Sequence, residues 1–109
     1  MPYQFGDIVL LDYPFTNAIG SKRRPGLVLL PESDGDILFT RITSQDRVGD
    51  WEVAIRDWKA SRLLYPSVIR LSKLVSLESS LILKDIGQLT QRDRDAVSLT
   101  LARMVSNIR

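Results

Sequence analysis

The feature that most constrains the fold of this chain is the spacing of its apolar runs. Over the first two thirds of the sequence these runs are short and are separated by turn residues. Asp7–Asp12 is rich in β-forming residues and follows a glycine, and Gly26–Leu30 is an apolar run bounded by proline on both sides. Runs of this length are too short for helices and are typical of strands. We expect the second one to be buried on both faces.

More strands are predicted downstream. Asp34 and Gly35 form a dipeptide that is a hairpin signal. The strands expected after it cover 37–42, 51–55, 67–71 and 74–77, and 82–88 is expected to be a short strand or a turn. Two segments are predicted to lack regular structure, a polar loop over 13–24 and an irregular stretch over 57–66.

The end of the chain changes to a helical period. Thr90 is a predicted N-cap, and Asp93 stands where it would complete a capping box. One apolar stripe follows at helical spacing, made of Val97, Leu101, Met104, Val105 and Ile108. A run of strands before a single helix predicts a mainly β fold with a C-terminal helix, which is either a small and strongly bent β-barrel or a sheet closed by the helix.

The length of 109 residues fits one domain, which we expect to cover 1–109. With 44% hydrophobic residues, such a domain can bury a core without a metal or a disulfide. The N-terminus has no basic segment before an apolar one, and no apolar run approaches the roughly 20 residues that span a bilayer. We therefore expect a cytoplasmic protein.

The chain contains neither histidine nor cysteine. A histidine general base, a Ser-His-Asp triad, a cysteine nucleophile and a metal held by His or Cys are therefore excluded. Any catalysis must come from Arg, Lys, Asp, Glu, Ser, Thr or Tyr, and we expect no metal site and no cofactor. The net charge of +2 is too small to indicate a nucleic-acid partner by itself.

Two polar stretches border predicted strands. Lys22, Arg23 and Arg24 precede Pro25, which biases Arg24 toward extended geometry, and a guanidinium held at the foot of a strand suits a phosphate. The alternative is a solvated loop whose charges protect an aggregation-prone strand. Further on, the segment 41–45 ends a strand in hydroxyl and amide groups, which either contact a phosphate or ribose or simply cap the strand.

A third stretch, 67–73, places Arg70 in the middle of a strand, where a charge without a partner is unfavourable. Arg70 either pairs with a carboxylate such as Asp12 or Glu52, or faces a cleft that binds an anion. The aromatic residues Trp58 and Tyr65 lie in the irregular segment. They either stack on a base or, more commonly, anchor a loop or a subunit interface.

Taken in order, these segments resemble the MazF/PemK family of toxin ribonucleases. The resemblance rests on the opening strand from Gly6, on Arg24-Pro25 before an apolar strand, and on Ile42-Thr43-Ser44. It continues through the segment 66–70 and through 86–89 before the last helix, and so runs from about Gly6 to the C-terminus. It implies an SH3-like small barrel of the MazF/PemK/CcdB toxin type, usually a homodimer.

The resemblance also implies an activity. Family members cleave single-stranded RNA at short sequences, without metal, by attack of the ribose 2′-hydroxyl on the adjacent phosphate. By position, Arg24 corresponds to the arginine that acts on the scissile phosphate, Thr43 to its threonine partner, and Arg70 to a general acid or phosphate clamp. RNA-binding roles are expected for Lys22, Arg23, Ser44, Gln45, Ser72 and Lys73. Some relatives place an aspartate, the proposed base, where this chain has Ser72, so the resemblance does not identify the base.

The resemblance implies a cognate antitoxin with an acidic tail as the partner. Two other functions remain open. One is a decayed toxin that only binds RNA or antitoxin. The other is an inhibitor of a protein target like the gyrase-poisoning toxins, although this chain lacks the C-terminal aromatic residue that those toxins use.

Overall fold

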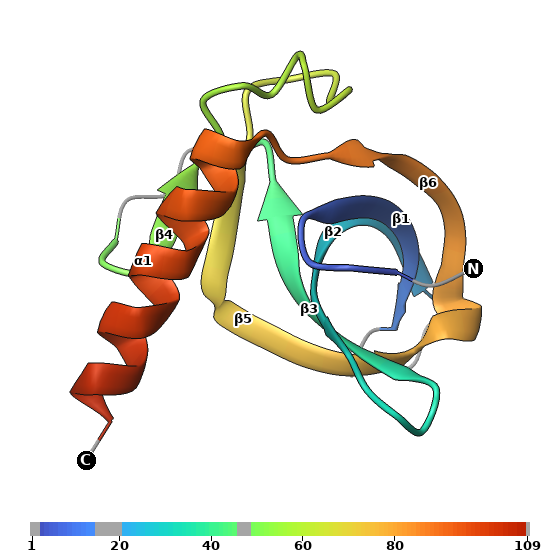
Figure 1. Cartoon of the computed structure of the whole chain (residues 1–109). Coiled ribbons are helices and arrows are strands. Elements are labelled where there is room, and N and C mark those ends of the chain that lie inside the picture. The colour runs from blue at the N-terminus through green and yellow to red at the C-terminus, as the bar shows by residue number, and fades with distance from the viewer. Residues whose placement is uncertain (1–2, 15–20, 46–48, 109) are drawn as a thin grey trace.

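The computed structural model describes residues 3–14, 21–45 and 49–108. It consists of six strands, one short 3₁₀ helix and one α-helix (Figure 1). The elements in chain order are β1 (Asp7–Pro14), β2 (Ser21–Pro31), β3 (Asp36–Thr43), β4 (Glu52–Ala54), β5 (Val68–Glu78), η1 (Ser79–Leu81), β6 (Ile82–Gln88) and α1 (Gln91–Asn107).

The strands form one sheet in the order β4-β5-β3-β2-β1-β6, and every neighbouring pair is antiparallel. The sheet coils strongly, so that β5 and β6 curve around β1 and β2, while α1 lies across the β4–β5 end (Figure 1). The predicted mainly β fold with a C-terminal helix is confirmed. The sheet is barrel-like but not closed, because β4 and β6 remain its two edges.

Strand alternation sorts the apolar side chains into two cores. The inner core lies inside the coil and contains Val9, Leu11, Val28, Ile37 and Phe39. The outer core lies between the opposite face of the sheet, α1 and the segment 51–63. Its buried members include Ile8, Leu27, Leu29, Ile42, Ile69, Leu71 and Val97. Because both faces of β2 are covered, the prediction for Gly26–Leu30 is confirmed except at Leu30, which is 58% exposed.

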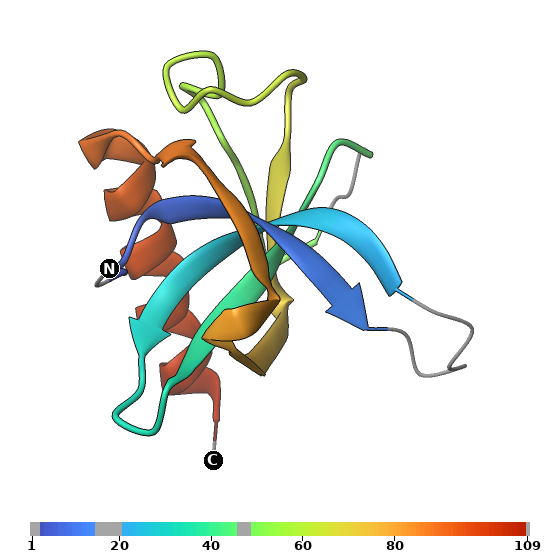
Figure 2. The ribbon, with the colours of Figure 1, turned by 90° about the vertical axis from the view of Figure 1, so that its right-hand side faces the viewer.

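The first hairpin is longer than predicted. The polar segment 13–24 was expected to be a loop, but β1 continues to Pro14 and β2 begins at Ser21. Backbone pairing carries the ladder outward from Leu11 opposite Arg24 to Pro14 opposite Ser21. The rest of the predicted loop, 15–20, lies outside the described residues. Figure 2 shows this hairpin projecting away from α1, on the other side of the sheet.

The two strands predicted at 67–71 and 74–77 are one bent strand, β5. Against β3, Arg41 pairs with Arg70, whereas the preceding residue, Thr40, pairs with Leu74. Three residues of β5 are therefore unmatched at the bend. The buried Thr40 hydroxyl donates a hydrogen bond of 2.5 Å to the Arg70 carbonyl oxygen. The bend lies where the sequence pattern placed a break, but the ladder continues through it.

The C-terminal helix agrees with the prediction over its first half. Val97 is fully buried, and Leu101 and Met104 pack against the outer core. The last two residues of the predicted stripe are not buried, since Val105 is 67% and Ile108 is 76% exposed. Both residues lie at the C-terminal end of the helix, which diverges from the sheet in Figure 1. No helix in the described part of the chain is long and apolar enough to cross a membrane.

The predicted capping box is wrong, although Thr90 is the N-cap. The Asp93 carboxylate is fully buried and accepts hydrogen bonds from the backbone amides of Arg56 (3.0 Å) and Asp57 (2.9 Å). Thr90 makes no side-chain capping bond, and its hydroxyl donates to the Asp57 carboxylate at 2.6 Å. Both polar groups therefore tie α1 to the segment 56–66 instead of to the helix terminus.

The segment 57–66, predicted to be irregular, is a defined turn without strand or helix. The amide of Arg62 donates to the Lys59 carbonyl and that of Leu63 to the Trp58 carbonyl, both at 3.0 Å. Arg62 takes a left-handed φ of 66°, which ends the turn. The turn packs so closely on β6 that a side chain at Gly87 would overlap the Ser61 carbonyl oxygen.

We predict that Asp93→Ala lowers the free energy of unfolding by about 2–4 kcal/mol, because two partly buried backbone amides lose their acceptor, which is fully buried. Urea unfolding followed by circular dichroism measures this change. Asp95→Ala on the exposed face of the same helix is the matched control, and we expect its effect to stay within about 0.5 kcal/mol. Equal effects of the two variants would show that Asp93 does not anchor the turn.

A second prediction concerns Asp57. Hydrogen bonds from the Arg92 guanidinium, at 2.7 and 3.0 Å, and from the Thr90 hydroxyl hold the pKa of Asp57 below its ordinary value. A lowered pKa in the folded state stabilises the protein above the unfolded pKa, and this contribution is lost as the pH falls through the folded pKa.

Wild type should therefore melt at a higher temperature than Asp57→Asn at neutral pH. The difference in melting temperature between the two proteins should be constant down to about pH 4 and should become smaller below that pH. Thermal melts from pH 7 to pH 2 measure it, and a difference that grows on acidification would contradict the assigned pairing.

Candidate functional site

Three arginines gather on the face of the sheet that continues from the inner core. Arg41 on β3 lies directly opposite Arg70 on β5, and Arg70 lies directly opposite Glu52 on β4. Directly opposite residues project from the same face with Cβ atoms about 5 Å apart. Glu52, Arg70 and Arg41 therefore form a row across three strands.

Arg24 and Thr43 extend this row toward the strand ends. Gly26 pairs with Arg41, and continuing that antiparallel register by two residues places Arg24 opposite Thr43. Thr43 is two positions from Arg41 in β3, and Arg24 is two positions from Gly26, the partner of Arg41 in β2, so both share the face of the row. We call Arg24, Arg41, Thr43, Glu52 and Arg70 the arginine patch.

The arginine patch carries an excess of positive charge that the fold only partly compensates. Like charges directly opposite each other destabilise a strand pair, as Arg41 and Arg70 must do here. The Glu52 carboxylate lies 3.8 Å from Arg70 Nε, and both side chains are largely buried. Within the described residues Arg70 Nε is buried without a hydrogen bond, so the contact with Glu52 is an ion pair at long range.

Of the two options considered for Arg70, pairing with a carboxylate is observed, since its Nε lies 3.8 Å from Glu52 Oε2. An anion-binding role stays a prediction. The Arg70 carbonyl oxygen is held by Thr40, which fixes the backbone beneath the guanidinium. Ser72, two residues further on, donates to Glu52 Oε2 at 3.4 Å. Together these contacts set Arg70 beside a carboxylate and a hydroxyl.

Thr43 is 8% exposed, and its hydroxyl oxygen accepts a hydrogen bond of 3.2 Å from the backbone amide of Gln45. This contact is the strand-capping role considered for the segment 41–45. It leaves the hydroxyl proton of Thr43 available as a donor. The capping role and a role in binding an anion are therefore compatible.

A groove of about 490 Å³ opens near the same strand ends, and we call it the basic groove. Its floor is apolar and includes Leu10, Pro25 and Ile42, and its rim carries charged, polar and aromatic side chains. The rim includes Arg23, Arg24, Thr43, Ser44, Gln45, Arg62, Tyr65 and Lys84. Alternation places Arg23 and Ser44 on the opposite face from the patch, so Arg24 and Thr43 border both surfaces.

The expected RNA-binding residues divide between these two surfaces. Arg23, Ser44 and Gln45 are exposed at the basic groove. Ser72 and Lys73 are exposed at the bend of β5, beside the arginine patch. The backbone of Lys22 belongs to β2, opposite Tyr13, and its side chain lies outside the described part of the structure.

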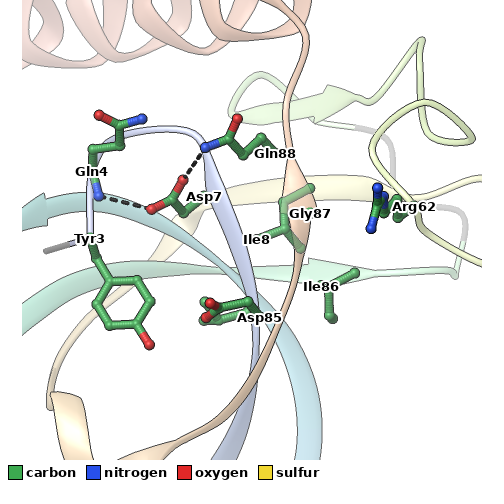
Figure 3. A pocket seen from close by; sticks show the side chains of 10 residues that line it. Tyr3, Gln4, Asp7, Ile8, Arg62, Asp85, Ile86, Gly87 and Gln88 are labelled. Atoms are coloured by element: carbon green, nitrogen blue, oxygen red, sulfur yellow. Dashed lines mark hydrogen bonds between the residues drawn. The ribbon is translucent and has the colours of Figure 1, made fainter. Parts of the chain in front are cut away.

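A second cavity, of about 330 Å³, lies along β6 and has the opposite character (Figure 3). Asp7 accepts hydrogen bonds from the Gln4 amide and the Gln88 side chain, both at 2.9 Å. Burial and the neighbouring Asp85 carboxylate raise the pKa of Tyr3. Two carboxylates, Asp7 and Asp85, line this acidic pocket together with one cation, Arg62, so it suits a polyanion less well than the basic groove does.

The sequence indicated Glu52 only as a possible partner of Arg70, and the position of Arg41 beside Arg70 was not predicted. The signal was present, because Arg41 stands two residues before Thr43 in a strand and must share its face. The two aromatic residues of the irregular segment lie in different surroundings. Trp58 packs on the outer core as a loop anchor, whereas Tyr65 is 64% exposed on the groove rim. No group of three His, Cys, Asp or Glu able to hold a metal ion occurs among the described residues.

Comparison with protein families gives a match over nearly the whole chain. The model of the PemK-like, MazF-like toxin of type II toxin–antitoxin systems matches residues 4–105. That span contains every member of the arginine patch. No curated protein sequence matches the chain.

Solved structures of similar fold were found as well. An endoribonuclease in complex with its cognate antitoxin from a mycobacterial species is 15% identical, with a TM-score of 0.78 over 99% of each chain. MazE–MazF from Deinococcus radiodurans is 20% identical, with a TM-score of 0.75 over 95% of this chain and 96% of that one. The Mycobacterium tuberculosis toxin MazF-mt6 is 19% identical, with a TM-score of 0.70 over 90% and 96%.

Proposed function

The chain belongs to the PemK-like, MazF-like toxin family of type II toxin–antitoxin systems, and on this basis we propose that it is a metal-independent endoribonuclease. Its substrate is single-stranded RNA, cut at a short sequence by attack of a ribose 2′-hydroxyl on the adjacent phosphate. The observation that carries the proposal is the arginine patch, with three guanidinium groups and one hydroxyl on a single sheet face.

Electrostatics support this assignment. A phosphodiester bears one negative charge and gains another as the 2′-oxygen attacks, so fixed cations stabilise the transition state more than the ground state. Arg24 and Arg41 make no hydrogen bond or ion pair with other described residues, which leaves their guanidinium groups free for an anion. The strands hold these groups in place before the substrate arrives.

Each catalytic residue has a distinct role in the proposal. Arg24 stabilises the charge on the pentacoordinate phosphate, and Thr43 donates its hydroxyl proton to a non-bridging oxygen or positions the 2′-hydroxyl. Arg70 acts as a phosphate clamp. A general-acid role suits it less, because a guanidinium does not release its proton in proteins.

The flanking nucleotides extend over the basic groove in this proposal. The groove adjoins the patch at Arg24 and Thr43, and its rim offers Arg23, Lys84 and an exposed tyrosine ring. Further hydrogen-bond donors to the RNA backbone come, in this proposal, from Lys22, Ser44, Gln45, Ser72 and Lys73. Contacts between cationic side chains and phosphates make RNA binding salt-dependent. Stacking on the Tyr65 ring holds a base with little dependence on which base it is.

The proposal includes two protein partners in the cytoplasm. An antitoxin with an acidic tail would compete with RNA for the same cationic surface. A second copy of the chain would form a homodimer, which is supported by apolar side chains left exposed at Leu99 and Val105 of α1 and at Ile108, directly after it.

The test is cleavage of a long single-stranded RNA in EDTA by wild type and by Arg24→Ala. We expect wild type to cut at a short recurring sequence and to leave 2′,3′-cyclic phosphate ends. Arg24→Ala should be slower by about 10²–10³-fold, the usual cost of removing one group that stabilises a transition state. Arg56→Ala, which changes an exposed arginine away from the patch, is the matched control and should cut normally.

The outcomes separate the alternatives. Cleavage that survives Arg24→Ala unchanged would refute the assigned site. RNA binding without any cleavage by wild type would instead support a decayed toxin that retains only RNA or antitoxin binding.

A further inference from the structure

The proposed reaction needs a group that removes the proton of the 2′-hydroxyl, and the family resemblance leaves that base unidentified. We propose that Glu52 is the general base. The inference rests on the proposed ribonuclease function and adds to it a catalytic residue on β4, the edge strand of the sheet.

The first support is the position of Glu52. Its pairing partner on β5 is Arg70, and that arginine is directly opposite Arg41 on β3. Glu52 Oε2 lies 3.8 Å from Arg70 Nε. A phosphate clamped by Arg70 would therefore bring its neighbouring ribose close to this carboxylate.

The second support is the way in which the carboxylate is held. Oε2 accepts the Ser72 hydroxyl at 3.4 Å, and a side chain at Gly49 would overlap Oε1. The Glu52 side chain is only 12% exposed, so it is packed in one place yet borders the surface where Ser72 is exposed. A base must be positioned before the substrate binds, and these contacts provide that.

Glu52 has a charged neighbour on the adjacent strand. Arg70 faces it from β5, and Arg41 stands one strand further along the row. Arg103 of α1 lies over the Trp51 ring at 5.0 Å and donates to the Asp50 carbonyl oxygen at 2.8 Å. Asp50 adds one acidic group near this edge of the sheet. The immediate partner of the carboxylate is thus a cation.

The other described acidic residues are placed elsewhere. Asp12 pairs with Arg23, on the face opposite the patch. The remaining ones lie in the acidic pocket, at the β2–β3 turn and the end of β5, or around the start of α1. They are Asp7, Asp85, Glu32, Asp34, Asp36, Glu78, Asp57, Asp93 and Asp95. Asp50 precedes β4 and is exposed, outside the paired residues of the row. In the described part of the chain, Glu52 is the carboxylate in the row with the arginines.

The step is balanced without a cofactor. Glu52 accepts the 2′-hydroxyl proton while the 2′-oxygen forms a bond to phosphorus and the bond from phosphorus to the 5′-oxygen breaks. The 5′-oxygen leaves with that electron pair and takes a proton from water. The products are a 2′,3′-cyclic phosphate and a 5′-hydroxyl, and Glu52 returns its proton to solvent.

The test compares wild type, Glu52→Gln and Glu52→Asp on one RNA with a single cleavage site. Glu52→Gln should lower kcat by about 10²–10⁴-fold, the usual contribution of a general base. RNA affinity and melting temperature should remain close to wild type. Glu52→Asp should recover part of the rate, and Glu78→Gln on the distant end of β5 should change nothing.

Two readouts separate a base from a structural residue. The rise of kcat/KM with pH on the acid side should be present in wild type and absent from Glu52→Gln. Formate, a small carboxylate, should partly restore cleavage by Glu52→Ala.

Cleavage by Glu52→Gln at the wild-type rate, or with the wild-type pH profile, would overturn the assignment of the base. The ribonuclease proposal would then stand. Absence of cleavage by wild type would overturn both.

Discussion

The break in register between β3 and β5 is the constraint on which the site depends. Three residues of β5 are unmatched between Arg70 and Leu74, and the Thr40 hydroxyl satisfies the Arg70 carbonyl oxygen at that point. The bend lets the sheet coil around the inner core. It also places Leu71 in the outer core while Arg70 and Ser72 meet Glu52. One local irregularity thus shapes the barrel and arranges the patch.

Positive charge is concentrated on one part of the sheet. Arg24, Arg41 and Arg70 lie where β2, β3 and β5 meet, whereas the pocket along β6 is lined by Asp7 and Asp85 together with Arg62. Since the whole chain has a net charge of only +2, its composition conceals this uneven distribution. The positive surface attracts a polyanion, which supports the proposed path of RNA over the arginine patch.

Much of the fold could be predicted from local sequence patterns, whereas the site could be predicted only in part. Short apolar runs and the stripe from Val97 predict strands and a helix because periodicity reports which face is buried. The pattern could not show that Asp93 turns away from its own helix, since its partners are amides 36 and 37 residues away in sequence. Likewise, Arg41 and Glu52 join the patch through strand pairing, which the sequence does not display.

The central claim is that RNA meets the arginine patch, and the side-chain Nε–Hε NMR signals of the arginines test it directly. A single-stranded oligonucleotide with 2′-O-methyl riboses binds without being cut, because the attacking hydroxyl is blocked. The account predicts that signals of Arg24, Arg41 and Arg70 shift on titration while those of Arg92 and Arg103 stay in place. Shifts confined to arginines outside the patch would contradict it.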